Sequence, residues 1–248
     1  MTENTDKLFV KLIAPNLPIE TVPRILDGLE ANPVLDATHA SGDERKRVPY
    51  VRATAEEAAR NGFVSLWRTK APKYGGWLST KSSTTDGLTL EFNPAPSPPA
   101  LAAVFDGAAR LADVMRPEFG FVHLCYVRDP DAVAYNRGFA SMTGRVLDRV
   151  GIANVHARNW FGPYLVKLLG RDFLLAFPYA REKSWGGIQV DLVAEPWSSD
   201  FETLRVGQEE VMKRLNATGT VCATEGPPVL WKPGPNWISP GWSPAKRR

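Results

Sequence analysis

The chain has 248 residues, of which 44% are apolar and 23% are charged. This composition is typical of a globular protein and excludes wholesale disorder, and the length suits one large domain or two closely packed ones. Two cysteines exclude a disulfide scaffold or a cysteine-rich zinc domain, and no apolar run reaches the ~18 residues of a membrane helix. The polar N-terminal sequence lacks a secretory signal, so we expect a cytoplasmic protein without a membrane partner.

The net charge of +3 is concentrated at the C-terminal end of the sequence. Residues 226–248 contain four basic residues and no acidic one, which leaves 26 basic against 27 acidic residues in 1–225. A near-neutral body weighs against direct nucleic-acid binding, which needs lysine and arginine clustered on a folded surface. The C-terminal segment also holds six prolines and Trp231, Trp237 and Trp242. We expect a Pro/Trp-rich basic tail that lies extended on the body of the protein or on a partner.

Runs of apolar residues in the N-terminal part follow the periods of strands and helices in turn. In chain order we expect a strand at 8–14, a helix over 18–29, a solvated charged loop at 39–49, a short helix from Thr54, a strand at 63–67, a loop or irregular hairpin over 73–86, and a strand at 88–92. The proline-rich segment 94–99 then breaks regular structure.

The C-terminal part begins with the most regular helical pattern of the chain. In order we expect a helix over 98–115, a strand at 119–127, a helix over 130–140, a helix over 164–169 that ends at Gly170, a helix end or buried strand at 173–177, a strand at 188–193, a helix over 199–215 and a last strand at 220–224. Asp191 falls on the polar side of its strand, which predicts that its carboxylate faces solvent.

Strands and helices alternate irregularly along the chain, with several pieces that suit hairpins. This order favours an α+β fold with a mixed, largely antiparallel sheet and packed amphipathic helices. We expect a single domain over residues 1–225, followed by the tail 226–248. If the domain divides into two packed halves, the proline-rich break places the boundary near residue 95.

No common catalytic or nucleotide-binding motif is present, and the three histidines are not at metal-ligand spacing. His123 and Cys125 fall on one face of a predicted strand, so a Cys–His dyad or half a metal site is geometrically possible. Because no second Cys/His pair accompanies them, we interpret them as ordinary residues of a sheet face. We expect no catalysis, no metal and no cofactor, and keep a small enzyme with a site near His123 and Cys125 as the alternative.

Two predicted loops combine an aromatic residue with flexible polar neighbours, as protein-binding loops often do. The loop 73–86 contains Tyr74 and Trp77, and the loop 181–187 contains Glu182 and Trp185. Both loops adjoin predicted strands, so a sheet could hold them on one side. We hypothesise that these four residues contact a protein partner, with burial of the tryptophans in the core as the competing interpretation.

Residues 159–172 read Asn-Trp-Phe-Gly-Pro-Tyr-Leu-Val-Lys-Leu-Leu-Gly-Arg-Asp, and a Gly-Gly pair and an amphipathic helix follow them. This segment resembles the immunity protein 52 family of bacterial polymorphic-toxin and type VI secretion systems. The residues that carry the resemblance are Trp160, Phe161, Gly162, Pro163, Tyr164, Gly170, Arg171, Asp172, Gly186 and Gly187.

The resemblance implies an α+β protein without catalytic activity that binds and neutralises a cognate toxin. The usual partner of the family is a nuclease of restriction-endonuclease fold. The matched residues suit a scaffold: Gly162 and Pro163 would form a strand-to-helix turn, and Gly170 would end the helix in a left-handed conformation. An effector adaptor or chaperone of a secretion system is the alternative binding role.

Overall fold

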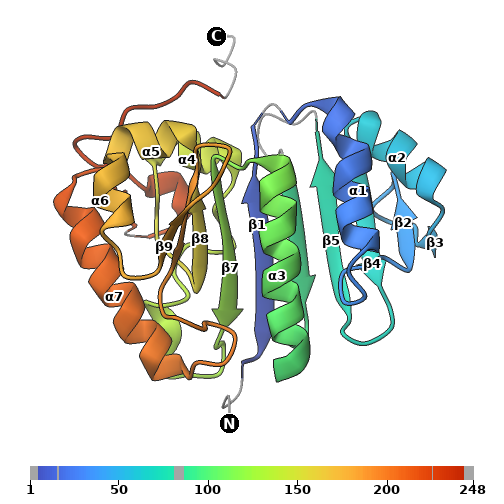
Figure 1. The fold of residues 1–248 in the computed structure, drawn as a ribbon, viewed down its shortest axis with the longest axis horizontal. Coiled ribbons are helices and arrows are strands. Elements are labelled where there is room, and N and C mark those ends of the chain that lie inside the picture. Colours follow the sequence, from blue (N-terminus) through green and yellow to red (C-terminus); the bar gives the residue numbers. More distant parts are fainter. Residues whose placement is uncertain (1–4, 16, 81–86, 225, 243–248) are drawn as a thin grey trace.

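A ten-stranded antiparallel sheet forms the centre of the computed structural model, which describes residues 5–15, 17–80, 87–224 and 226–242. The strands lie in the order β3-β2-β4-β5-β6-β1-β7-β8-β10-β9, and every neighbouring pair is antiparallel. Helices pack against this sheet (Figure 1), which confirms the expected α+β class.

The strands are β1 (Lys7–Ile13), β2 (His39–Ser41), β3 (Val48–Pro49), β4 (Phe63–Arg68), β5 (Tyr74–Ser79), β6 (Gly87–Phe92), β7 (Phe119–Cys125), β8 (Arg158–Phe161), β9 (Ala180–Glu182) and β10 (Ile188–Asp191). The helices are α1 (Val22–Glu30), α2 (Arg52–Arg60), α3 (Pro98–Met115), α4 (Gly144–Val150), α5 (Pro163–Leu169), α6 (Arg171–Leu175) and α7 (Phe201–Ala217). Three single turns of 3₁₀ helix are η1 (Ile19–Thr21), η2 (Pro130–Val133) and η3 (Pro228–Leu230). Within the described ranges, no helix has the length and apolarity needed to cross a membrane.

The first strand of the chain lies in the middle of the sheet, between β6 and β7. Strands from the N-terminal part therefore lie on one side of β1 and strands from the C-terminal part on the other (Figure 1). The sheet is continuous across the proline-rich segment 94–99, because β1 bonds to β6 and to β7 over most of its length.

Two apolar clusters pack on opposite faces of this sheet, because successive side chains of a strand point to opposite sides. On β7, Val122 and Leu124 join a first cluster with side chains of α1, α2 and α3, which lie together on one face (Figure 1). Phe119 and Phe121 join a second cluster, to which α4 to α7 and the C-terminal segment contribute. The second cluster includes no residue of β4, β5 or β6, so the face of these strands opposite α1 to α3 has no core of its own.

Two segments that we expected to be loops are partly strands. Residues 39–49 contain β2 and β3, and β5 occupies most of the segment 73–80. The rest of that second segment, 81–86, lies outside the described residues. The loop interpretation fails in both segments for one reason: short polar or glycine-rich segments lack an apolar signal, and hydrogen bonds to the neighbouring strand β4 supply the structure instead. The hairpin alternative for the second segment agrees with the antiparallel pairs of β5 with β4 and β6.

Two further elements are shorter than expected. The segment 130–140 contains only the turn η2 in place of a helix, and the segment 220–224 forms isolated bridges in place of a strand. These bridges join Val221 to Ile152 and Ala223 to Lys232, so they hold the start of the C-terminal segment to the body.

The expectation that Asp191 faces solvent is wrong, because its carboxylate is 2% exposed and ion-paired. The Nε and Nη2 atoms of Arg158 donate to its two oxygens at 2.6 and 2.8 Å, and the side-chain amide of Gln189 lies 3.3 Å from both. Arg158 also donates to the carbonyl oxygen of Phe105 in α3. A buried charge needs such a partner, and this one lies 33 residues away on β8, beyond the reach of a local pattern.

The C-terminal segment lies on the body of the protein. Trp231 is 6% exposed within the second cluster, and Trp237 and Trp242 pack on the same cluster. The indole of Trp237 donates to the carbonyl oxygen of Asp148, whose carboxylate accepts from Ser239 and from the backbone of residues 241 and 242. The segment is thus fixed by both burial and hydrogen bonds.

Candidate functional site

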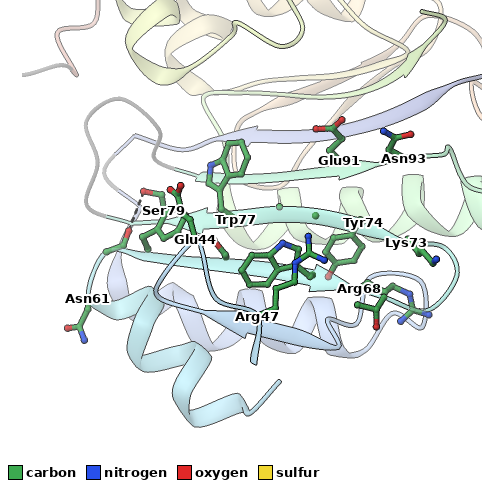
Figure 2. A pocket seen from close by; sticks show the side chains of 17 residues that line it. Glu44, Arg47, Asn61, Arg68, Lys73, Tyr74, Trp77, Ser79, Glu91 and Asn93 are labelled. Carbon is green, nitrogen blue, oxygen red and sulfur yellow. Dashed lines mark hydrogen bonds between the residues drawn. The ribbon is translucent and has the colours of Figure 1, made fainter. Parts of the chain in front are cut away.

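A broad hollow of about 1140 Å³ lies on the face of β4, β5 and β6 that the second cluster leaves uncovered. Its walls come from the β2–β3 hairpin and from the two ends of these strands (Figure 2). The side chains that shape it are Glu44, Arg47, Asn61, Phe63, Ser65, Trp67, Lys73, Trp77, Ser79, Glu91 and Asn93.

Small residues, glycine and serine, keep the strand surface that forms the floor of this hollow flat. Gly75 lies opposite Trp67 in the register of β4 and β5, and a Cβ atom there would contact the Trp67 ring at 3.5 Å. A Cβ atom at Gly76 would lie 2.2 Å from the carbonyl oxygen of Thr89, so only glycine fits there. The Gly-Gly pair that suggested a loop therefore allows close packing of three strands.

Two half-buried tryptophans stand on this floor, on adjacent strands. Trp67 belongs to β4, and the guanidinium carbon of Arg47 lies 5.4 Å from the centre of its ring. Trp77 belongs to β5 (Figure 2) and also borders a small cavity lined by Lys11, Thr89 and Met142. The tryptophans give the hollow the large, rigid apolar surface that protein interfaces favour.

Several charged groups around the hollow are neutralised within the protein. Lys7 pairs with Glu91 at 2.8 Å, and Arg68 pairs with the carboxylate of Asp36. Within the described residues, Arg47, Lys73 and Glu44 form no ion pair, although all three line the hollow. The uncompensated charge of the lining is therefore two cations against one anion.

The four residues that we expected to contact a partner do not lie together. Trp77 lies in the hollow. Tyr74 is a core residue, 4% exposed: its hydroxyl donates to the carbonyl oxygen of Leu35 at 2.6 Å, and burial raises the pKa of this phenol. Tyr74 also lines the hollow, but alternation on β5 turns its side chain toward α1 to α3, so its ring is buried and contact with a partner stays a prediction.

Glu182 and Trp185 lie far from the hollow, because five strands separate β5 from β9 in the sheet. The indole of Trp185 donates to Asp113 of α3 at 3.1 Å, on the helix-covered face. Glu182 pairs with Arg171 at 2.6 Å, and this hydrogen-bonded partner lowers its pKa. The structure therefore corrects the expectation that one side of the sheet presents both segments.

The residues of the family-like motif form a scaffold at the other end of the sheet. Trp160 and Phe161 are buried on β8, and Gly162 and Pro163 make the turn into α5. The φ angle of Gly162 is −75°, so its role is steric: a Cβ atom there would lie 2.5 Å from the Cα atom of Glu118. Gly170 ends α5 with a φ angle of 97°.

The remaining motif residues join α5 and α6 to their neighbours. Tyr164 contacts the rings of Trp237 and Trp242, and Arg171 contacts Asp172 beside its ion pair with β9. In the β9–β10 hairpin, Gly186 has a φ angle of 85°, and a Cβ atom on Gly187 would overlap the ring of Trp185. These contacts all lie within the folded chain.

His123 and Cys125 are buried within the sheet. The Nε2 atom of His123 lies 3.1 Å from the side-chain oxygen of Asn136, and burial lowers the pKa of this imidazole to about 3. Burial likewise raises the pKa of the Cys125 thiol to about 11. A neutral thiol is a weak nucleophile. The described residues contain no group of three His, Cys, Asp or Glu side chains suited to hold a metal ion.

The sequence interpretation missed two residues of the hollow. For Trp67 the signal is the alternation of Phe63, Ser65 and Trp67 against Val64 and Leu66, which indicates a second face of this strand. Arg47 lies in a run of mixed charges, which by itself indicates only a solvated loop. No local pattern places its guanidinium over a ring 20 residues away.

No protein-family model and no curated protein matches the chain. Among solved structures, the fold is similar to that of the Pseudomonas aeruginosa T6SS protein PA0821, with a TM-score of 0.51. The sequences are 15% identical, and the similarity covers 89% of this chain and 75% of that one. At this level of identity the comparison establishes a shared fold and nothing further.

Proposed function

We propose that this protein is an immunity protein of a type VI secretion system, which binds a cognate toxin in the cytoplasm and thereby neutralises it. The observation that carries the proposal is the broad hollow on β4, β5 and β6, outside the second apolar cluster, with the half-buried Trp67 and Trp77 in its lining. An apolar surface of this kind, rimmed by polar residues, is typical of a protein-binding site.

Two further points support the assignment. A solved structure that shares the fold is named as a T6SS protein, where T6SS stands for type VI secretion system. The motif at residues 159–172 resembles immunity proteins, whose toxins are commonly nucleases of restriction-endonuclease fold. We therefore propose such a nuclease as the partner, and inhibition by binding without catalysis.

The binding role is favoured over the enzymatic alternative by the state of His123 and Cys125. A Cys–His dyad needs a thiolate beside an imidazole that exchanges protons near neutral pH. Burial shifts the pKa of both side chains in the opposite direction, toward the neutral thiol and the neutral ring. We propose that the two residues serve to fill the sheet face.

Co-expression with the candidate toxin encoded beside its gene tests the proposed function. Growth and co-purification are scored together, with the parent chain and a Trp67→Ala/Trp77→Ala variant. We expect the parent to restore growth and to co-purify with the toxin, and the variant to do neither while remaining folded. Co-purification without protection would indicate the adaptor role instead, and the absence of both would refute binding of that toxin.

A further inference from the structure

The charges around the hollow indicate which kind of partner surface would fit it. Once the internal pairs Lys7–Glu91 and Arg68–Asp36 are set aside, the lining retains Arg47 and Lys73 against Glu44. Beside Arg47, the segment between β2 and β3 adds the exposed cations Arg45 and Lys46 and the exposed anion Asp43. The hollow thus combines an apolar floor with a rim that carries a net positive charge.

The Arg47 guanidinium is restrained by the Trp67 ring in a position that suits contact with an anion. Its carbon lies 5.4 Å from the centre of the Trp67 ring, and such stacking restricts a side chain that would otherwise be mobile. Within the described residues no acceptor bonds to this guanidinium, so its donors remain available to a carboxylate.

The size of the hollow favours a polypeptide segment over a small molecule. Its volume of about 1140 Å³ exceeds the usual ~300–1,000 Å³ of a small-molecule pocket, and it is open along one side. Residues at its two ends, Asn61 and Lys73, lie at opposite ends of β4 and β5 (Figure 2). A segment that follows the strands would pass both tryptophans.

We infer that the hollow receives an acidic segment of the partner protein, with an apolar side chain between Trp67 and Trp77 and a carboxylate on Arg47 and Lys73. The inference rests on the proposed function in one respect, namely that the partner is a protein. It goes beyond that function because it specifies which kind of segment of the partner the hollow binds. The DNA-binding cleft of a nuclease is basic and has the wrong charge for this rim, so the toxin is bound through a different, acidic surface.

Titration of the full chain with short peptides tests the inference without the toxin. The probes are the peptide Glu-Glu-Phe-Glu-Glu, its counterpart Lys-Lys-Phe-Lys-Lys, and oligothymidylate. The readout is the NMR signals of the indole N–H groups, with those of Trp67 and Trp77 assigned by Trp→Phe variants. We expect the acidic peptide alone to shift these two signals, with millimolar affinity that falls as salt screens the charges.

Arg47→Glu should remove this response, and Arg24→Glu should retain it. Arg24 is an exposed arginine of α1 on the helix-covered side of the sheet, so the control makes the same charge change away from the hollow. Shifts of equal size with the lysine peptide would overturn the inference, as would no response to millimolar acidic peptide. Binding of oligothymidylate in place of the acidic peptide would make the hollow a nucleic-acid site and would also overturn it.

Calorimetry with the toxin separates this inference from the proposed function. If the parent binds, we expect Arg47→Glu to weaken the affinity by at least ~10-fold, and Arg24→Glu to leave it unchanged. Tight binding by Arg47→Glu would refute the acidic-segment inference and leave the immunity function standing. Failure of the parent to bind or protect would refute the function, while the peptide titration still decides what the hollow accepts.

Discussion

Gly162 is a position at which the surroundings of the backbone exclude any side chain. A Cβ atom there would lie 2.5 Å from the Cα atom of Glu118 and 2.6 Å from the carbonyl oxygen of Pro117. Since the backbone angles are ordinary, the whole cost of a substitution arises from this contact. We expect Gly162→Ala to lower the free energy of unfolding by about 1–3 kcal/mol, measured by urea denaturation.

Gly144 offers a matched control for this prediction. It lies at the start of α4, and a Cβ atom there would meet the side chain of Ile13 at 3.5 Å, an ordinary contact. Gly144→Ala should therefore be neutral or slightly stabilising, because alanine favours the helix. An equal loss of stability in both variants would show that the close approach to Glu118 is not the cause.

Two buried histidines make the stability of the protein depend on pH. His123 and His156 are fully buried, and burial lowers the pKa of His123 to about 3 and that of His156 well below its usual value. Between about pH 3 and 6.5 the unfolded chain binds protons that the folded rings do not, so stability falls as the pH is lowered. The slope should reach about 1.4 kcal/mol per pH unit for each ring.

His156→Phe tests the origin of this slope. Neither ring nitrogen of His156 has a hydrogen-bond partner among the described residues, and its ring lies 4.0 Å from that of Phe121, so phenylalanine suits the site. The titratable groups that act on it are His123 and Lys11, and both lower its pKa further. We expect a flatter dependence of the unfolding free energy between pH 7 and pH 5 in urea titrations. A slope equal to that of the parent would mean that other groups dominate.

At the scale of elements, the C-terminal segment completes the second core cluster. Trp231 follows η3, fills that cluster and donates from its indole to the carbonyl oxygen of Gly226. We expect Trp231→Ala to lower the free energy of unfolding by about 3–5 kcal/mol, the range for a buried tryptophan. Val229→Ala, in the same turn but 71% exposed, should have little effect. Equal melting temperatures for the two variants would show that the segment does not stabilise the body.

Elements with a strong apolar period were predictable from the sequence, and elements held by distant partners were not. The helix over 98–115 and the strands at 8–14, 88–92 and 119–127 each show a clear apolar pattern, on one face or, at 119–127, on both, and the structure confirms these elements to within a few residues. The short strands β2 and β3 carry no such pattern and form because the hairpin adds to the edge of β4. The buried ion pair of Asp191 depends on β8, where the sequence showed no clear period.

At the scale of the whole molecule, the sequence located one tryptophan of the candidate site but not the residues that surround it. Trp77 was identified because it is aromatic amid glycine and serine. The arrangement of the sheet then decides which residues accompany it: Trp67 and Arg47 from β4 and the β2–β3 hairpin, and not Glu182 or Trp185. Because the first strand lies in the middle of the sheet, the two predicted binding segments lie on opposite sides of β1. No local sequence pattern indicates this separation.

This separation gives a test of which face the toxin covers. Trp77 is half-buried in the hollow and belongs to neither core cluster, so Trp77→Ala should leave the fold intact and weaken toxin binding by ~30-fold, the ~2 kcal/mol typical of an aromatic hot spot. Trp185 packs against the first cluster and bonds to Asp113, so Trp185→Ala should instead lower the free energy of unfolding, by about 1–3 kcal/mol, with unchanged affinity. Circular dichroism, thermal melts and calorimetric titration measure the two effects separately. A folded Trp185→Ala variant that loses affinity while Trp77→Ala keeps it would place the toxin on the helix-covered face.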